Sequence, residues 1–189
     1  MNTRFVSMLI FFTLVIGFWG AGLLAEVEGE RPPEANRLKP DHAPAPFSAA
    51  EIRDSIYNGL RFKYQLQATD KPVIFAVITF WAWSEEGVTV EAVRFDSEGK
   101  QVGEKKINCM EWEEIQKLGS FPEADTKITS ETINTPAGTF ECWLYKVTSG
   151  GKKEKHVERH WFAKTMPGLP VYIEEKVAGQ LMLKFTLVE

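Results

Sequence analysis

A tight turn that leads into a long strand is encoded by Thr135-Pro136-Ala137-Gly138-Thr139-Phe140-Glu141-Cys142-Trp143-Leu144-Tyr145-Lys146-Val147. Pro136 suits the first central position of a type I turn, and Gly138 suits the position that closes it. Further along the chain, Met166-Pro167-Gly168-Leu169-Pro170-Val171 is a second turn signal. There Gly168 can supply the positive φ that a type II turn requires after a proline. The two turns predict an antiparallel meander in the C-terminal part of the chain.

Alternation of apolar and polar residues predicts strands on both sides of this stretch. Strands are expected at 60–68, 73–84, 88–95 and 100–108, and further strands are expected between residues 126 and 188. The segment 73–84 is apolar at both alternating sets of positions, so we expect it to be covered on both faces or to line a cavity. The whole pattern predicts a sheet of about eight strands.

Two short helices interrupt the strands. Ser48 followed by Glu51 has the capping-box pattern, and apolar residues at helical spacing continue a helix to about residue 58, where Gly59 can end it. An apolar residue at every third position, beginning with Trp112, predicts a second helix within 109–118. Together these elements predict an α+β fold, in which a curved antiparallel sheet (a half-barrel) carries two short helices on one face.

The N-terminal part of the chain differs in composition from the rest. In residues 1–25 the charged residue Arg4 is followed by an apolar run that ends in small residues. This pattern predicts a secretory signal peptide, and the run is also long enough for an uncleaved membrane anchor. Residues 26–46 are rich in proline and charge, which predicts a disordered or extended linker. We therefore expect an extracytoplasmic (periplasmic or secreted) domain at 47–189, which would be held at a membrane only if the leader stays uncleaved.

Net charge and motifs exclude several classes of function. The formal net charge is −4 at pH 7, and this mild acidity argues against binding to nucleic acid. The sequence has no Gly-x-Ser-x-Gly motif, no phosphate-binding glycine loop and no His-Glu-x-x-His helix. We expect no enzymatic activity and no cofactor.

Three polar residues of one expected strand are candidate metal ligands. His156, Glu158 and His160 alternate along the chain and therefore share one face of a strand. Two histidines and one carboxylate can bind a metal ion, but neighbours on one face of a flat strand lie about 7 Å apart. We expect these side chains to form an outward polar face, with Val157 and Trp161 pointing inward, and no metal site.

Cys109 and Cys142 are the two cysteines of the chain. An exported protein meets oxidising surroundings, so a disulfide between them is one prediction. It would close a loop of about 34 residues and stabilise the fold by roughly 3–4 kcal/mol. The alternative is two buried reduced thiols, since Cys142 lies between Phe140 and Leu144 on one strand face.

Aromatic residues are the remaining candidates for a ligand site. Most of them are expected in the core, and the functional alternative is an aromatic-lined cavity for an apolar ligand. The cavity candidates are Phe75, Trp81, Trp83, Trp112, Trp143 and Trp161.

The C-terminal motifs carry a family resemblance. The stretch 135–142, then Tyr145, the segment 161–163 and the segment 167–171 resemble exported bacterial proteins of unknown function that are similar to the lipoprotein-localisation (LolA/LolB-like) superfamily. The resemblance spans about residues 61–189 and is specific in the C-terminal third. It implies a half-barrel whose concave side lies under helices and, in that superfamily, accepts acyl chains. It supplies no catalytic residues, and the leader lacks the cysteine of a lipid-anchored protein.

Two classes of function follow from these observations. The first is a non-catalytic carrier or sensor of an apolar ligand, such as lipid or lipoprotein acyl chains. The alternative is a structural or assembly subunit of the cell envelope that acts through contacts with other proteins. A closed pocket between sheet and helices would favour the first, and an apolar patch on the outer face would favour the second.

Overall fold

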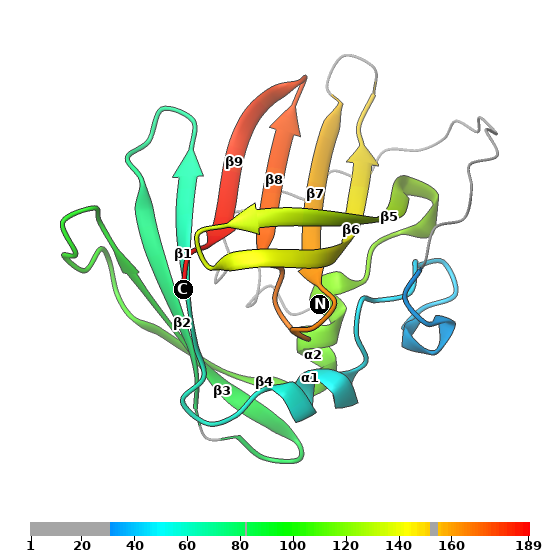
Figure 1. The fold of residues 1–189 in the computed structure, drawn as a ribbon, viewed down its shortest axis with the longest axis horizontal. Helices are drawn as coiled ribbons and strands as arrows, with labels where there is room; N and C mark the ends of the chain where they lie inside the picture. Colours follow the sequence, from blue (N-terminus) through cyan, green and yellow to red (C-terminus); the bar gives the residue numbers. More distant parts are fainter. Residues whose placement is uncertain (1–30, 82, 152–154) are drawn as a thin grey trace.

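The fold is given by a computed structural model, which describes residues 31–81, 83–151 and 155–189 (Figure 1). The leader predicted at 1–25 lies outside the described residues. The described part contains two α-helices, α1 (Ala49–Ser55) and α2 (Trp112–Gln116). It also contains three short 3-10 helices, η1 (Glu34–Asn36), η2 (Lys117–Gly119) and η3 (Glu123–Asp125). In this part of the chain, no helix combines the length and the apolar character needed to cross a membrane.

Nine strands of the described residues form one curved antiparallel sheet, which confirms the predicted α+β class with one strand more than the expected eight. Their order in the sheet is β4-β3-β2-β1-β9-β8-β7-β6-β5. The strands are β1 (Arg61–Ala68), β2 (Ile74–Trp81), β3 (Gly87–Phe95), β4 (Lys106–Glu111), β5 (Thr126–Thr135), β6 (Gly138–Ser149), β7 (His156–Ala163), β8 (Tyr172–Val177) and β9 (Gln180–Leu187).

Two meanders make up this sheet. Strands β1 to β4 pair in chain order, and so do β5 to β9, while pairing of β1 with β9 joins the two halves. At this junction Tyr64 lies opposite Leu187, and the rings of Tyr64 and Phe185 stack with their centroids 4.2 Å apart. The predicted C-terminal meander is therefore present, and it is closed against the N-terminal strands by a pairing between residues far apart in sequence.

Both predicted turns are present. Pro136 and Ala137 separate β5 from β6, and the segment around Gly168 connects β7 to β8. Gly138 has a φ of +144° and Gly168 a φ of +134°. Residues with a Cβ atom rarely adopt this part of the φ range, so glycine is needed at both positions.

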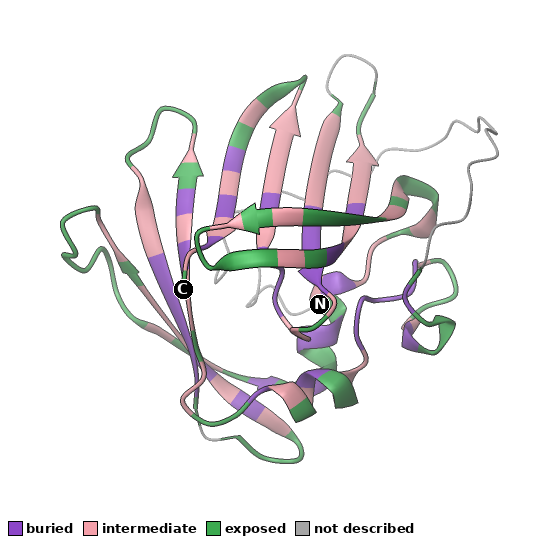
Figure 2. Ribbon diagram, viewed as in Figure 1, coloured by how far each residue is buried: buried purple, intermediate pink, exposed green. Residues whose placement is uncertain are grey.

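One face of the sheet, called the inner face here, carries the core. Residues at alternate positions of each strand point to it, and α1 and α2 add their apolar residues to the same cluster. Figure 2 shows the buried positions recurring along the strands and on the helices. The predicted packing of two helices on one face is thus confirmed. Buried strand residues of the inner face include Tyr64, Leu66, Ala76, Ile78, Phe80, Val88, Val90, Met110, Tyr145, Phe162, Ile173, Phe185 and Leu187.

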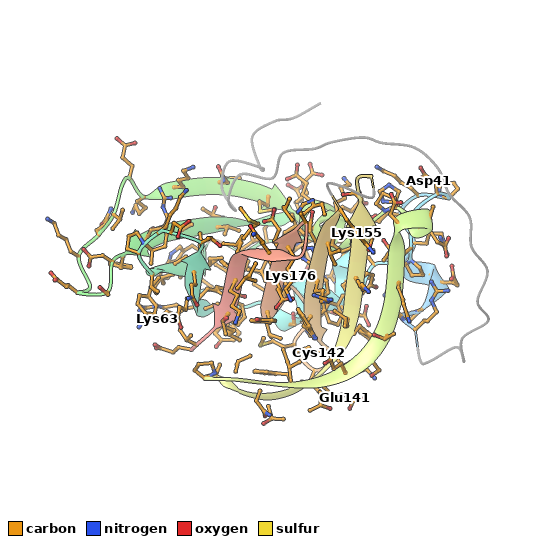
Figure 3. All side chains as sticks on the ribbon, turned by 90° about the horizontal axis from the view of Figure 1, so that it is seen from above. Asp41, Lys63, Glu141, Cys142, Lys155 and Lys176 are labelled. Atoms are coloured by element: carbon orange, nitrogen blue, oxygen red, sulfur yellow. The ribbon has the colours of Figure 1, made fainter. Side chains whose placement is uncertain are left out.

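The opposite, outer face is covered in part by the β5–β6 hairpin. Figure 1 shows β5 and the first part of β6 crossing in front of β7, β8 and β9, and Figure 3 shows Glu141 and Cys142 on that side of the sheet. The indole N–H of Trp161 donates to Glu131 Oε2 over 3.0 Å, and Lys164 Nζ donates to Glu141 Oε1 over 2.8 Å. Trp161 and Cys142 are therefore buried although they point to the outer face.

Residues 31–46, called the strap, pack against the domain, so the prediction of a disordered or extended linker is wrong for them. Ala43 and Ala45 are both 0% exposed. The N–H of Ala43 donates to the carbonyl of Phe121 over 2.9 Å, which joins the strap to the segment between α2 and β5. The folded domain therefore begins before residue 47.

Side chains hold the strap in place as well. Tyr145 Oη donates to the carbonyl oxygen of Pro44 over 2.6 Å in a buried position. Arg37 Nη1 lies 2.7 Å from Glu123 Oε2, and this bond holds the pKa of the Glu123 carboxyl below its ordinary value. Alanine and proline lose almost no side-chain entropy on burial, and the strap's backbone groups find partners in the protein. A composition typical of linkers is therefore compatible with a buried segment.

Two predicted element boundaries shift. Helix α1 ends at Ser55, earlier than expected, because Ile56 adopts an extended conformation. Strand β4 begins at Lys106, not at residue 100, and it includes Cys109, which the sequence placed in the second helix. The intervening residues form a connection in which Gly103 has a φ of +74°.

Candidate binding surface at the aromatic end

The six predicted cavity residues do not converge on one site. Strand pairing puts three of them on the outer face and one on the inner face, and the other two lie outside the strands. Strand β2 is buried on both faces along its middle, as the sequence predicts, and its last residue is exposed. Phe75, Trp81 and Trp161 point to the outer face, Trp143 points to the inner face, Trp112 lies on α2, and Trp83 follows the end of β2.

Three of these tryptophans are packed as parts of the fold. Trp112 is 4% exposed, and its indole N–H donates to the carbonyl of Ser84 over 3.0 Å. Trp161 is 7% exposed beneath the β5–β6 hairpin. The Trp143 ring lies 5.6 Å from the ring of Phe47, the residue that follows the strap. These rings contribute buried apolar area, and they do so on opposite sides of the sheet.

Three other aromatic residues, Tyr57, Trp81 and Trp83, are exposed together and are called the aromatic end. Their exposed fractions are 64%, 44% and 38%. Tyr57 lies in the connection from α1 to β1, where the N–H of Gly59 donates to the carbonyl of Phe80 over 2.6 Å. This bond holds the connection beside the end of β2, at the lower end of the molecule in Figure 1. Tyr57 was not predicted as a site residue. Its one sequence signal, an aromatic residue close to the end of a helix, does not indicate whether the side chain is buried or exposed.

A cleft of about 270 Å³ opens beside the aromatic end. The ring of Trp83 lies 6.2 Å from the ring of Trp112, which lines the cleft, and the indole N–H of Trp83 donates to the carbonyl of Arg53 over 3.3 Å. The lining residues are Ala49, Ala50, Arg53, Glu85, Glu86, Glu111, Trp112 and Glu113. Four glutamates and one arginine give this lining a formal charge of −3. The cleft is therefore acidic, with an aromatic wall.

Local sequence explains why both helices begin at this cleft. Ser48 caps α1 and forms a capping box with Glu51. Glu111 caps α2 and forms a second capping box with Glu114. Because each box satisfies backbone N–H groups at a helix start, it fixes where the helix begins and how the cleft wall is oriented. The first of these boxes is the one that the sequence predicts.

His156, Glu158 and His160 lie on the inner face, so the prediction that they form an outward polar face is wrong. Glu158 Oε2 lies 3.1 Å from His160 Nε2, and Glu175 Oε1 of β8 lies 2.9 Å from His156 Nε2. The ring of Phe121 covers His160 at 4.8 Å. Each imidazole thus has a carboxylate partner for one ring nitrogen, which allows it to face the covered side of the sheet. In the described ranges, no three His, Cys, Asp or Glu side chains are placed to hold a metal ion.

Cys109 and Cys142 are free thiols in the structure, so the predicted disulfide is wrong, and the alternative of two buried thiols is right for Cys142 but wrong for Cys109. They lie on β4 and β6, the first and eighth strands in the sheet order. Cys109 is exposed, whereas Cys142 is buried. Burial raises the pKa of the Cys142 thiol to about 12. The order of the strands in the sheet therefore keeps Cys109 and Cys142 apart, although an oxidising location would allow a disulfide.

Two buried donors on the inner face lack hydrogen-bond partners among the described residues. They are Tyr64 Oη and Trp143 Nε1. Burial also raises the pKa of the Tyr64 hydroxyl far above its ordinary value. A buried polar group without a partner costs about 1–3 kcal/mol, so a water molecule or a ligand atom that accepts from either group would be stabilising.

Comparison with known proteins gives a partial family match and a fold likeness. Residues 125–186, which span β5 to β9 except for Leu187 at the end of β9, match a family described as protein of unknown function (DUF3108). No curated protein shows a significant match. Two solved structures are similar. One is a candidate exported protein with a YmcC-like fold from Bacteroides fragilis (15% identity, TM-score 0.44). The other is a candidate lipoprotein from Parabacteroides distasonis (13% identity, TM-score 0.49).

Each of these alignments covers 70% of this chain and 95% of the other chain. The family match includes the turn and strand with which the C-terminal meander begins. The resemblance to the LolA/LolB-like superfamily stays a prediction.

Proposed function

We propose that this chain is an exported, non-catalytic binding domain that contacts another protein of the cell envelope through its aromatic end. The exposure of Tyr57, Trp81 and Trp83 at one end of the molecule is the observation that carries the proposal. Tyrosine and tryptophan are enriched at the centres of protein interfaces, because each buries a large area and keeps a polar group for a hydrogen bond. Export rests on the leader pattern of residues 1–25.

The local structure supports a preformed contact surface. The hydrogen bond from Trp83 to the Arg53 carbonyl fixes its indole edge while the side chain stays 38% exposed. The connection that carries Tyr57 is tied to β2 through Gly59. Side chains that are already held in place lose less conformational entropy when a partner binds.

Photo-crosslinking tests the proposal. A photoreactive phenylalanine analogue is placed at Trp81 or, as a control, at Ile107, which is 55% exposed on the edge strand β4. After irradiation in the native envelope, we expect protein adducts of defined mass from position 81 and few from position 107. When Trp83→Ala is added to the variant with the photoreactive residue at position 81, the yield of adducts should decrease. Equal, unspecific adducts at both positions would contradict an interface at the aromatic end.

A second candidate function, binding of an apolar ligand such as a lipid acyl chain, is favoured by the inner face. Tyr64 Oη and Trp143 Nε1 are buried donors whose partners could be oxygen atoms of such a ligand. Native mass spectrometry of protein purified from its own envelope tests this function. The expected result is a bound mass that decreases in Tyr64→Phe; a ligand-free protein, or a bound mass that this change leaves unaltered, would contradict it.

A further inference from the structure

We infer that the partner of the aromatic end binds through a basic segment, in which a lysine or arginine enters the acidic cleft and apolar neighbours lie on Tyr57, Trp81 and Trp83. The inference rests on the proposed function and adds the chemistry of the partner. It begins from the position of the cleft, which has Trp112 in its wall and Trp83 at its side. One binding segment can therefore contact the cleft and the exposed rings together.

The charge of the cleft favours a cation. The lining contains four glutamates, and its one cation, Arg53, is already bound to Asp54 at 2.9 Å and Glu85 at 3.1 Å. The formal charge of −3 is thus available to attract a positively charged group. Charge complementarity of this kind steers association and discriminates between partners. It also disfavours a second copy of this chain, whose own net charge is −4.

The N-terminal ends of the two helices at the cleft do not reverse its preference for a positively charged group. The first turns of α1 and α2 border the cleft, and free N–H groups there would attract an anion. However, the side chains of both capping boxes already use these groups: the N–H of Glu51 donates to Ser48 Oγ over 3.2 Å, for example. An anionic partner would therefore meet glutamates and few free donors.

The size and aromatic wall of the cleft fit one long cationic side chain. Small-molecule pockets usually measure about 300–1,000 Å³, and this open cleft of about 270 Å³ lies just below that range. A lysine or arginine has an apolar stem that can lie along a tryptophan ring, and its charge is attracted to the ring face. The 38% exposed ring of Trp83 offers such a surface beside the carboxylates of the cleft, and Trp112, at 4% exposure, forms part of the wall behind it.

Binding of synthetic peptides to the full chain tests the inference. Two fluorescently labelled peptides share the same leucine and serine positions and carry either two lysines or two glutamates. We expect the lysine peptide to bind at least about tenfold more tightly than the glutamate peptide at low salt. The difference should shrink as salt is raised, because exposed charges are screened. Equal binding of the two peptides, or no binding of the lysine peptide, would overturn the inference.

Variants of the chain locate the effect. The double change Glu85→Gln and Glu86→Gln should weaken binding of the lysine peptide roughly three- to thirtyfold, since exposed charge pairs are individually weak. The matched control Glu98→Gln and Glu104→Gln removes two exposed charges from the β3–β4 connection and should leave binding unchanged. Equal weakening by both double variants would overturn the inference.

The crosslinking and peptide-binding results together distinguish failure of the inference from failure of the proposed function. If Trp83→Ala lowers crosslinking from position 81 but the peptides show no charge preference, the contact surface stands and the basic partner is wrong. If position 81 gives no specific adducts and no peptide binds, both are wrong. Self-association that Trp81→Ala abolishes, without binding of the lysine peptide, would put a second copy on this surface and overturn the inference.

Discussion

The strap and the aromatic end differ from their sequence-based expectations in opposite directions. The strap has the composition of an exposed linker, yet Ala43 and Ala45 are completely buried. Trp81 and Trp83 belong to the most apolar run of the chain after residue 25, yet both are exposed. Composition therefore predicted the wrong environment at both places.

The physical reason is the same in both regions. Burial depends on whether a neighbouring element covers the segment and satisfies its backbone groups. The strap finds such neighbours in Tyr145 and in the segment after α2. Trp81 is the last residue of β2 and Trp83 follows it, and both side chains remain exposed there. The strap therefore contributes buried contacts to the fold, and the aromatic end is the exposed surface for which binding of a partner protein is proposed above.

Removal of the strap should have the largest effect. A variant that begins at Phe47 should lose at least about 3 kcal/mol of its free energy of unfolding, because the buried contacts around Pro44 and Tyr145 are lost. A control variant that begins at Arg31 keeps these contacts. Urea denaturation of both variants gives the comparison, and equal midpoints would show that the strap is energetically a linker after all.

Replacement of a buried tryptophan should differ sharply from replacement of an exposed one. Trp161→Ala removes a ring that is 7% exposed and bonded to Glu131, and it should cost about 3–5 kcal/mol. Trp81→Ala, at a position 44% exposed, should cost no more than about 1 kcal/mol. Thermal and chemical denaturation measure both. A large loss for Trp81→Ala would mean that the aromatic end is part of the core.

Removing a single hydroxyl group from a tyrosine in each region tests the comparison of the strap with the aromatic end. Tyr145→Phe leaves the buried carbonyl of Pro44 without its donor and should destabilise the fold by about 1–3 kcal/mol. Tyr57→Phe changes a residue that is 64% exposed and should alter stability by less than about 0.5 kcal/mol. Denaturation curves of the two variants provide the measurement. Similar changes in both would argue against a tightly bound strap.

The smallest expected effect is a pH dependence of strap attachment. Hydrogen bonding to Arg37 lowers the pKa of Glu123. This pair therefore contributes stability above the unfolded value of about 4.3, and the contribution is lost as the pH falls through the lower folded value. In Arg37→Gln, melting temperature should depend less on pH between about 5 and 3. Because the Arg37–Glu123 pair is partly exposed, it contributes little to the free energy of unfolding. An unchanged pH profile in Arg37→Gln would show that the pair contributes nothing measurable.

Local patterns in the sequence determined much of the fold. The turn at Pro136 and Gly138, the capping box of Ser48 and Glu51, and the alternation along β9 each depend on residues close together in the chain. Their conformational preferences act over a few residues, so the pattern predicts them directly. The α+β class and the C-terminal meander follow from the same signals.

Tertiary structure alone decided which surfaces are covered. The pairing of β1 with β9, the inner position of His160 and the burial of the strap all depend on contacts between segments distant in sequence. The same contacts separate Cys109 from Cys142 and leave Trp81 exposed. Alternation along a strand shows that two faces differ, but which face is covered depends on what packs against it. The candidate binding surface could therefore be recognised only in the folded molecule.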